Sequence, residues 1–121
     1  MIGKPHLRDG GDLLAMAKSI GDLGDLIKLL SKGLSRAKPW QQRLAAQLSE
    51  MDRLLQVLRL TIALERSDAE ILVAARDLRV ACRQTSNTAS TTRADQVTKA
   101  SLQLAADLST SLLQAMEQRA T

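Results

Sequence analysis

Aromatic side chains are almost missing from this chain, which has one tryptophan, Trp40, and neither phenylalanine nor tyrosine. β-Branched residues are also scarce, and strands favour aromatic and β-branched side chains. Leucine, alanine, glutamine and arginine dominate instead, and these residues favour helices. At 121 residues and 45% hydrophobic content, the chain is large enough for one folded domain with its own core. The composition therefore predicts an all-α fold.

Histidine and cysteine are equally rare, with only His6 and Cys82 present. A single histidine near the chain start excludes most nucleophile–base pairs, and a metal site needs several ligands of this kind. We therefore expect no enzyme activity, no metal and no cofactor. Cys82 falls at helical spacing beside apolar residues, and we expect it to be buried rather than reactive. An unpaired cysteine and the lack of a recognisable secretory signal lead us to expect a cytoplasmic protein.

Long apolar runs are also missing, so no segment of the sequence is suited to span a bilayer. What the chain has instead is helical periodicity. Apolar residues follow alternating spacings of three and four from Leu13 to Leu34, as in a helix packed along one seam. Asp12 is the expected N-cap of this helix. Residues 1–11 contain three glycines and a proline, and we expect them to form a flexible N-terminus ahead of a single bundle domain over 12–121.

Two glycines, Gly21 and Gly24, interrupt this first helix. They indicate either a kink or a division into two shorter helices, which is the reading we favour. The alternative is close contact of the backbone with another helix, or a segment that becomes ordered only when bound. Pro39 is suited to open a second helix, whose apolar positions continue to Ile62. Ser67 and Glu70 have the spacing of a capping box. This spacing predicts a turn at 65–67 and a third helix from Asp68 to Gln84, although one continuous helix over 39–84 is the alternative.

The segment 85–92 holds no charged residue and mostly serine, threonine and asparagine. Such a composition predicts a loop. Thr92, with Asp95 three residues later, is expected to cap a fourth helix. Four helices with short connections favour an up-down four-helix bundle. The second and fourth helices each carry more apolar positions than one packed face requires, so we expect the bundle to form a homo-oligomer or to bind a partner protein.

Negative charge is absent from residues 28–43, which contain five basic residues. Residues 76–99 contain five basic and two acidic residues, while the rest of the chain has a net charge of −4. An up-down bundle would bring these two basic segments to one end. We therefore expect that end to bind a nucleic acid backbone or an acidic protein surface, through these residues: Lys28, Lys32, Arg36, Lys38, Arg43, Arg76, Arg79, Arg83 and Arg93.

Trp40 follows Pro39 at the start of the second helix. It is expected either to fix the start of that helix against residues 36–38 or to anchor a partner. Hydroxyl and amide groups of residues 85–92 could add contacts to phosphates.

The sequence thus predicts a non-catalytic accessory or adaptor protein with a basic end. The alternative is a pure protein–protein interaction module, such as a chaperone, an anti-activator or an assembly subunit. Binding of the first helix to a membrane surface ranks last, because that helix carries several acidic residues.

Overall fold

Four helices make up the chain in a computed structural model that describes the backbone of residues 3–120 and the side chains of residues 13–120. They are α1 (Gly3–Gly33), α2 (Pro39–Ala63), α3 (Asp68–Ser90) and α4 (Gln96–Ala120). No strand occurs between residues 3 and 120. The predicted all-α class is therefore confirmed.

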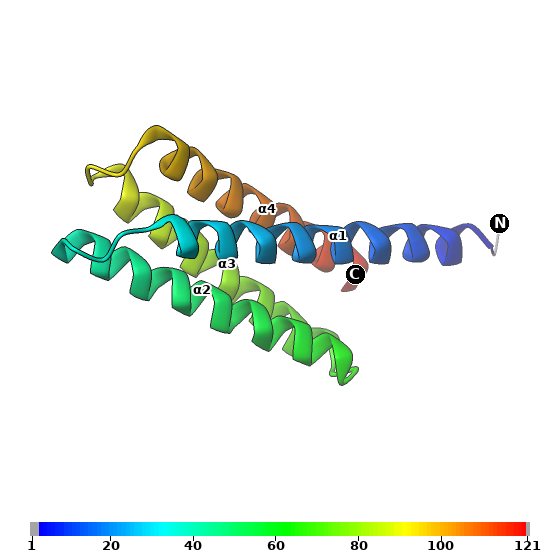
Figure 1. The fold of residues 1–121 in the computed structure, drawn as a ribbon. Helices are drawn as coiled ribbons and strands as arrows, with labels where there is room; N and C mark the ends of the chain where they lie inside the picture. The colour runs from blue at the N-terminus through cyan, green and yellow to red at the C-terminus, as the bar shows by residue number, and fades with distance from the viewer. Residues whose placement is uncertain (1–2, 121) are drawn as a thin grey trace.

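Each helix packs against two others, with α1 and α3 each lying between α2 and α4. Side-chain contacts show that α3 and α4 are antiparallel: Ser86 bonds to Gln103, whereas Arg79, earlier in α3, bonds to Thr110, later in α4. In Figure 1 the α1–α2 and α3–α4 connections lie at one end of the molecule, and the α2–α3 connection lies at the other. This arrangement brings residues near 36, 43 and 93 to a common end.

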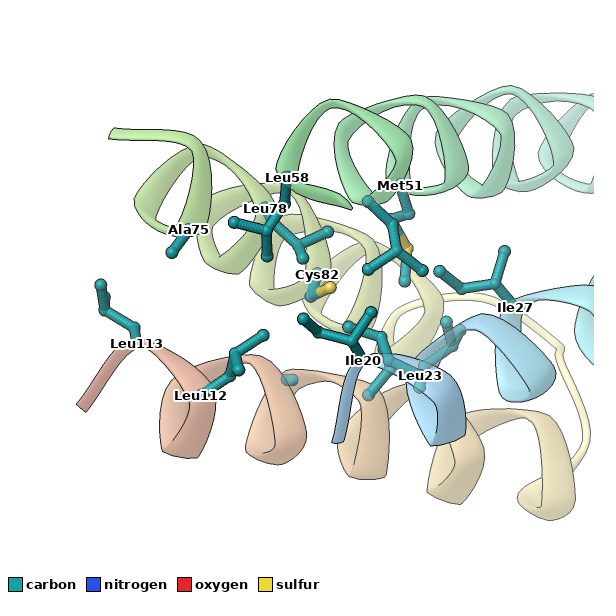
Figure 2. Packing of buried hydrophobic residues seen from close by; sticks show 14 of the residues in the cluster. Ile20, Leu23, Ile27, Met51, Leu58, Ala75, Leu78, Cys82, Leu112 and Leu113 are labelled. Atoms are coloured by element: carbon teal, nitrogen blue, oxygen red, sulfur yellow. The ribbon is translucent and has the colours of Figure 1, made fainter. Parts of the chain in front are cut away.

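The core is built from apolar side chains that all four helices direct inward (Figure 2). Leu23, Leu55 and Leu78 are fully buried. The periodic pattern predicted from Leu13 to Leu34 is confirmed in its central part, where Met16, Ile20, Leu23 and Ile27 are all buried, whereas Leu13 is exposed. Core side chains from the other helices include the following: Leu44, Met51 and Leu58 of α2, Cys82 of α3, and Leu102, Leu112 and Met116 of α4.

The α1 helix differs from the prediction at its start and at its glycines. It begins at Gly3 rather than after Asp12. The side chains of His6 and Asp12 lie outside the described residues, and the flexibility of residues 1–11 stays a prediction. The helix is also continuous through Gly21 and Gly24, so the favoured division into shorter helices is wrong. A Cβ at Gly24 would lie 2.7 Å from Arg59 Nη2 of α2, which makes Gly24 a point of close approach between helices.

The predicted turn between the second and third helices is confirmed, and the single helix over 39–84 is wrong. Glu65 adopts a left-handed backbone conformation with φ of 53°, which stops α2. Ser67 then caps α3 by accepting a hydrogen bond from the backbone N–H of Glu70 at 3.3 Å. The Glu70 carboxylate accepts hydrogen bonds from the Ser67 hydroxyl and from Arg66 Nε. The Arg66 guanidinium lowers the pKa of Glu70.

The predicted loop over 85–92 is wrong for most of its length, because α3 continues to Ser90. Thr85 is buried, and its hydroxyl donates to the carbonyl of Ala81 at 2.7 Å. Thr88 donates in the same way to the carbonyl of Gln84 at 2.9 Å. These bonds satisfy the polar side chains within the helix itself, and burial of Ala89 then fixes this last part of α3 against the core.

The connection to α4 is therefore short, covering residues 91–95. Its capping differs from the prediction too. Asp95, rather than Thr92, caps α4, since its carboxylate accepts a hydrogen bond from the backbone N–H of Thr98 at 2.7 Å. Hydrogen bonds from the Thr98 side chain and backbone lower the pKa of Asp95. Thr92 instead stabilises the turn, accepting from the Ala94 N–H and donating to the Ala89 carbonyl.

Candidate nucleic-acid interface

One end of the bundle concentrates positive charge. We call residues 34–43 and 86–99 the basic end, since both segments lie where α1 and α3 finish and where α2 and α4 start. They contain five basic residues and one acidic residue, Asp95. Four of the basic side chains are exposed: Arg36, Lys38, Arg43 and Arg93. The fifth, Lys99, is partly buried. The opposite end, residues 58–72 and 112–120, holds four acidic and three basic residues, so it does not share this character.

The basic end is held in shape by glutamine side chains. Gln41 accepts a hydrogen bond from the backbone N–H of Lys38 at 2.9 Å, just ahead of the first helical residue, Pro39. Gln42 Nε2 donates to the carbonyl of Arg36 at 3.1 Å. These bonds fix the α1–α2 connection to the first turn of α2. The positions of Arg36 and Lys38 are thereby tied to the helix that carries Arg43.

Arg43 and Arg93 meet at a surface cavity of about 320 Å³. We call it the basic-end pocket, and its lining comes from the first turns of α2, the last turn of α3 and the following connection: Trp40, Arg43, Thr88, Thr91, Thr92 and Arg93. The two arginines come from segments far apart in the sequence. The structure thus brings this pair of predicted site residues together.

Neither arginine of the basic-end pocket is neutralised by an acidic neighbour. Within residues 13–120, the ion pairs are Lys18–Asp22, Arg53–Glu50, Arg66–Glu70 and Arg76–Glu117, and none of them lies at the basic end. Arg36 and Lys38 form no ion pair in this part of the chain either. The cations at this end therefore remain free to attract an external anion.

The threonines of the pocket contribute differently from what was expected. Thr88 donates its hydroxyl proton to a carbonyl of its own helix, Thr91 donates to the Thr88 carbonyl at 2.8 Å, and Thr92 donates to the Ala89 carbonyl at 2.7 Å. A hydroxyl has one proton to donate. These side chains therefore offer no free hydroxyl proton to the pocket, and the two guanidinium groups are its charged donors.

Trp40 is partly buried and packs against the core cluster while also lining the pocket. Its contact with the core supports the expectation that it fixes the start of α2. Its place in the pocket leaves part of the indole available to a ligand. Both expected roles are therefore compatible with its position.

The remaining predicted site residues do not gather at this pocket. Lys28 and Lys32 line a groove between α1 and α2, together with Asp52 and Arg53. Arg76 lies 3.6 Å from Glu117 in a hollow between α3 and α4. These side chains lie on the sides of the bundle and not at its basic end.

The other two arginines of α3 lie on the same helix but in different surroundings. Arg79 donates from Nε to Thr110 at 3.3 Å, which ties it to α4. Arg83 is exposed and lies one turn closer to the basic end. Of the predicted basic residues on α3, Arg83 is therefore the one best placed to extend the basic end.

Gln47 is a residue of this region that the sequence reasoning missed. Its Nε2 donates to the Thr88 hydroxyl at 3.2 Å and joins α2 to the last turns of α3. Its Oε1 is buried with no hydrogen-bond partner among the described residues. The sequence signal was weak, because one glutamine among many in a helix does not mark an interhelical contact.

Cys82, the cysteine of α3, lies in the core rather than at the basic end. Cys82 is fully buried, as expected, and burial raises the pKa of its thiol to about 11. Such a thiol is almost entirely protonated at neutral pH and is a poor nucleophile. Between residues 13 and 120, no group of three histidine, cysteine or acidic side chains is placed to hold a metal ion. None of the helices, over the residues described, combines the length and apolar character needed to cross a bilayer.

Comparison with known proteins gives no further guide to the site. The chain matches no protein-family model, no curated protein and no solved structure. The function of the chain is therefore inferred from the geometry and charge of the basic end.

Proposed function

We propose that this chain is a non-catalytic accessory protein, an up-down four-helix bundle whose basic end binds the backbone of a nucleic acid. One observation carries the proposal: Arg43 and Arg93, from distant segments, line a single pocket with no acidic residue in its lining. The proposal includes a cytoplasmic location, which the free thiol of Cys82 supports.

The size of the molecule lets the basic end act independently of its acidic residues. The 25 residues of α2 span about 37 Å at about 1.5 Å per residue. The Debye length at physiological salt is about 8 Å. Acidic groups at the far end of the bundle therefore do little to weaken the field at the basic end. A nucleic acid that approaches this end meets an excess of positive charge.

The fold itself does little to favour the two arginines of the basic-end pocket. Arg43 lies in the second turn of α2, past the first turn, where the helix dipole has most of its effect, and it forms no ion pair within residues 13–120. Arg93 lies between the end of α3, where the dipole favours a cation, and the start of α4, where it disfavours one. Neither position is accounted for by an ion pair or by a net dipole effect, which supports an external anion as their partner.

The test is binding of a fluorescently labelled duplex DNA, measured by anisotropy at several salt concentrations. We expect the affinity to fall steeply as the salt concentration rises. Each phosphate that the protein neutralises releases bound cations and contributes about −0.9 to the slope of log affinity against log salt concentration. The double variant R43Q/R93Q should bind more weakly and show a smaller slope. The charge-matched comparison is the single variant R43Q with R119Q, because each removes one charge. Arg119 is exposed at the opposite end, so R119Q should bind like the wild type while R43Q binds more weakly.

Three outcomes would count against this function. Failure to bind either duplex or single-stranded DNA at low salt would refute it. Binding to polyglutamate but to neither form of DNA would assign the basic end to an acidic protein surface instead. Equal losses in the single variants R43Q and R119Q, each of which removes one charge, would show that net charge, rather than the basic end, determines binding.

A second function is favoured by apolar side chains that the fold leaves exposed. Val57 and Leu60 of α2, Leu64 just after it and Val73 of α3 are each at least 40% exposed. Val57 and Val73 line a groove of about 390 Å³ between these helices. We propose that these side chains are covered in a homo-oligomer or by a partner protein, as in a protein–protein interaction module. Light scattering that shows a stable monomer at micromolar concentration would argue against the homo-oligomer.

A further inference from the structure

The basic-end pocket has the features of a site for one nucleotide rather than for a simple inorganic anion. Its volume, about 320 Å³, falls at the lower end of the range for ligand pockets, about 300–1,000 Å³. Two guanidinium groups can donate hydrogen bonds to a phosphate. The hydroxyl protons of Thr88, Thr91 and Thr92 are bonded to carbonyls, and Thr88 and Thr92 each also accept one hydrogen bond. Each of these oxygens keeps at least one lone pair for a donor of the ligand. The lining therefore suits a ligand that carries both an anion and hydrogen-bond donors, as a nucleotide does.

Trp40 adds a stacking surface next to the cations. It lies three residues before Arg43 on α2, so the two side chains occupy neighbouring positions on one helix face. Contact with the core holds one part of the indole, while another part lines the pocket. An aromatic ring fixed in this way is prepared to stack on a flat base at little cost in side-chain entropy.

We propose that the basic-end pocket binds one nucleotide of a single-stranded nucleic acid, with its phosphate between Arg43 and Arg93 and its unpaired base on Trp40. Bases in a duplex are already stacked on each other, so only an unpaired base can reach the indole. This inference rests on the proposed function and narrows its ligand. A duplex still binds the basic end through its backbone, but more weakly.

The chain supplies its own probe for this site. Trp40 is the single tryptophan and there is no tyrosine, so the intrinsic emission of the protein comes from the pocket. We would titrate the full chain with an unlabelled 12-nucleotide oligothymidylate, with a duplex of the same length and with thymidine monophosphate. The single strand should change the Trp40 emission and bind about tenfold more tightly than the duplex, in line with the contribution of one stacked base.

Variants separate stacking from charge. These variants lack the single tryptophan, so their affinities are measured by the anisotropy of fluorescently labelled oligonucleotides. W40L should lose about tenfold in affinity for the single strand and bind the duplex like the wild type, while W40F should restore most of the loss. Circular dichroism and thermal melting of both variants establish that they are folded. R43Q/R93Q should lose affinity for both nucleic acids, and R119Q for neither.

Each contrary result has its own meaning. Unchanged Trp40 emission at saturating oligothymidylate, or W40L binding like the wild type, overturns the pocket inference but leaves backbone binding by the basic end intact. Thymidine monophosphate binding as tightly as the oligonucleotide overturns the single-strand assignment in favour of a small phosphorylated ligand. Failure of both nucleic acids to bind at low salt refutes the proposed function as well.

Discussion

Replacing Gly21 by alanine should stabilise the protein, because this glycine lies inside α1 without any close neighbour. A Cβ built there meets no atom within 4 Å, and its backbone does not adopt a positive φ. Alanine in a helix interior is favoured over glycine by about 0.8–1.0 kcal/mol. With an unfolding entropy of about 2.1 cal/mol/K per residue, about 1 kcal/mol raises the Tm of a chain of 121 residues by about 4 °C.

The same substitution at Gly24 should not give this gain. Its Cβ would lie 2.7 Å from Arg59 Nη2 and 3.4 Å from Leu55. The guanidinium must move away, and its hydrogen bond to the carbonyl of Ile20, 3.4 Å long, is lost. A hydrogen bond contributes about 0.5–1.5 kcal/mol. The loss therefore offsets most or all of the gain in helix propensity, and the Tm of G24A should stay close to that of the wild type.

A double-mutant cycle tests this explanation through urea unfolding of wild type, G21A, G24A and their combinations with R59A. In the R59A background, where the guanidinium is gone, G24A should stabilise the protein about as much as G21A does. If G24A already gains as much as G21A in the wild-type background, Arg59 moves aside at no cost. In that case Gly24 would not be a point of close approach.

Three further predictions concern single side chains. E65G should raise the Tm, because Glu65 has φ of 53°, a conformation that glycine adopts without strain; an unchanged or lower Tm would contradict this. D95A should lower the Tm at neutral pH, because the Asp95 carboxylate caps α4 and its pKa is lowered in the folded state. The difference in Tm from the wild type should persist above about pH 4 and disappear as the pH falls through the lowered pKa. A difference that does not depend on pH would point to packing instead. Cys82 should react with a thiol reagent such as 5,5′-dithiobis(2-nitrobenzoate) far more slowly in the native protein than in guanidinium chloride, because it is buried with its pKa raised to about 11; fast native reaction would show that the core opens at α3.

Helical periodicity predicted the core because burial depends on spacing. The residues from Met16 to Ile27 that repeat every three or four positions are the ones α1 buries. The same pattern could not reveal the state of Gly21 and Gly24. Intrinsic propensity disfavours both glycines, but α1 remains continuous because the part that holds them packs against the other helices, with Leu23 and Ile27 buried in the core. The tertiary contacts outweigh a local cost of about 1 kcal/mol per glycine.

Turn chemistry was predicted correctly at one connection and wrongly at the other. Ser67 and Glu70 cap α3 as their spacing indicated, since both groups lie within one turn of each other. The polar segment 85–92 was misread because its composition suggests exposure. Thr85 is instead buried, and its proton bonds to the preceding turn of its own helix. A hydroxyl satisfied inside a helix has the same sequence signature as one that faces water, so composition alone could not distinguish the two.

The longer α3 also changes how the basic end can recognise an anion. A flexible loop of hydroxyl groups would offer many adjustable donors to a phosphate. In the observed structure the hydroxyl protons of Thr88, at the end of α3, and of Thr91 and Thr92, in the connection that follows, are already bonded to carbonyls. In the proposed function, recognition therefore falls to Arg43 and Arg93. Two guanidinium groups on separate elements favour an anion of defined position over a diffuse charged surface. Because Trp40 is the one aromatic side chain of the whole protein and lines that same pocket, the basic end is better suited to hold a nucleotide than to attract charge alone.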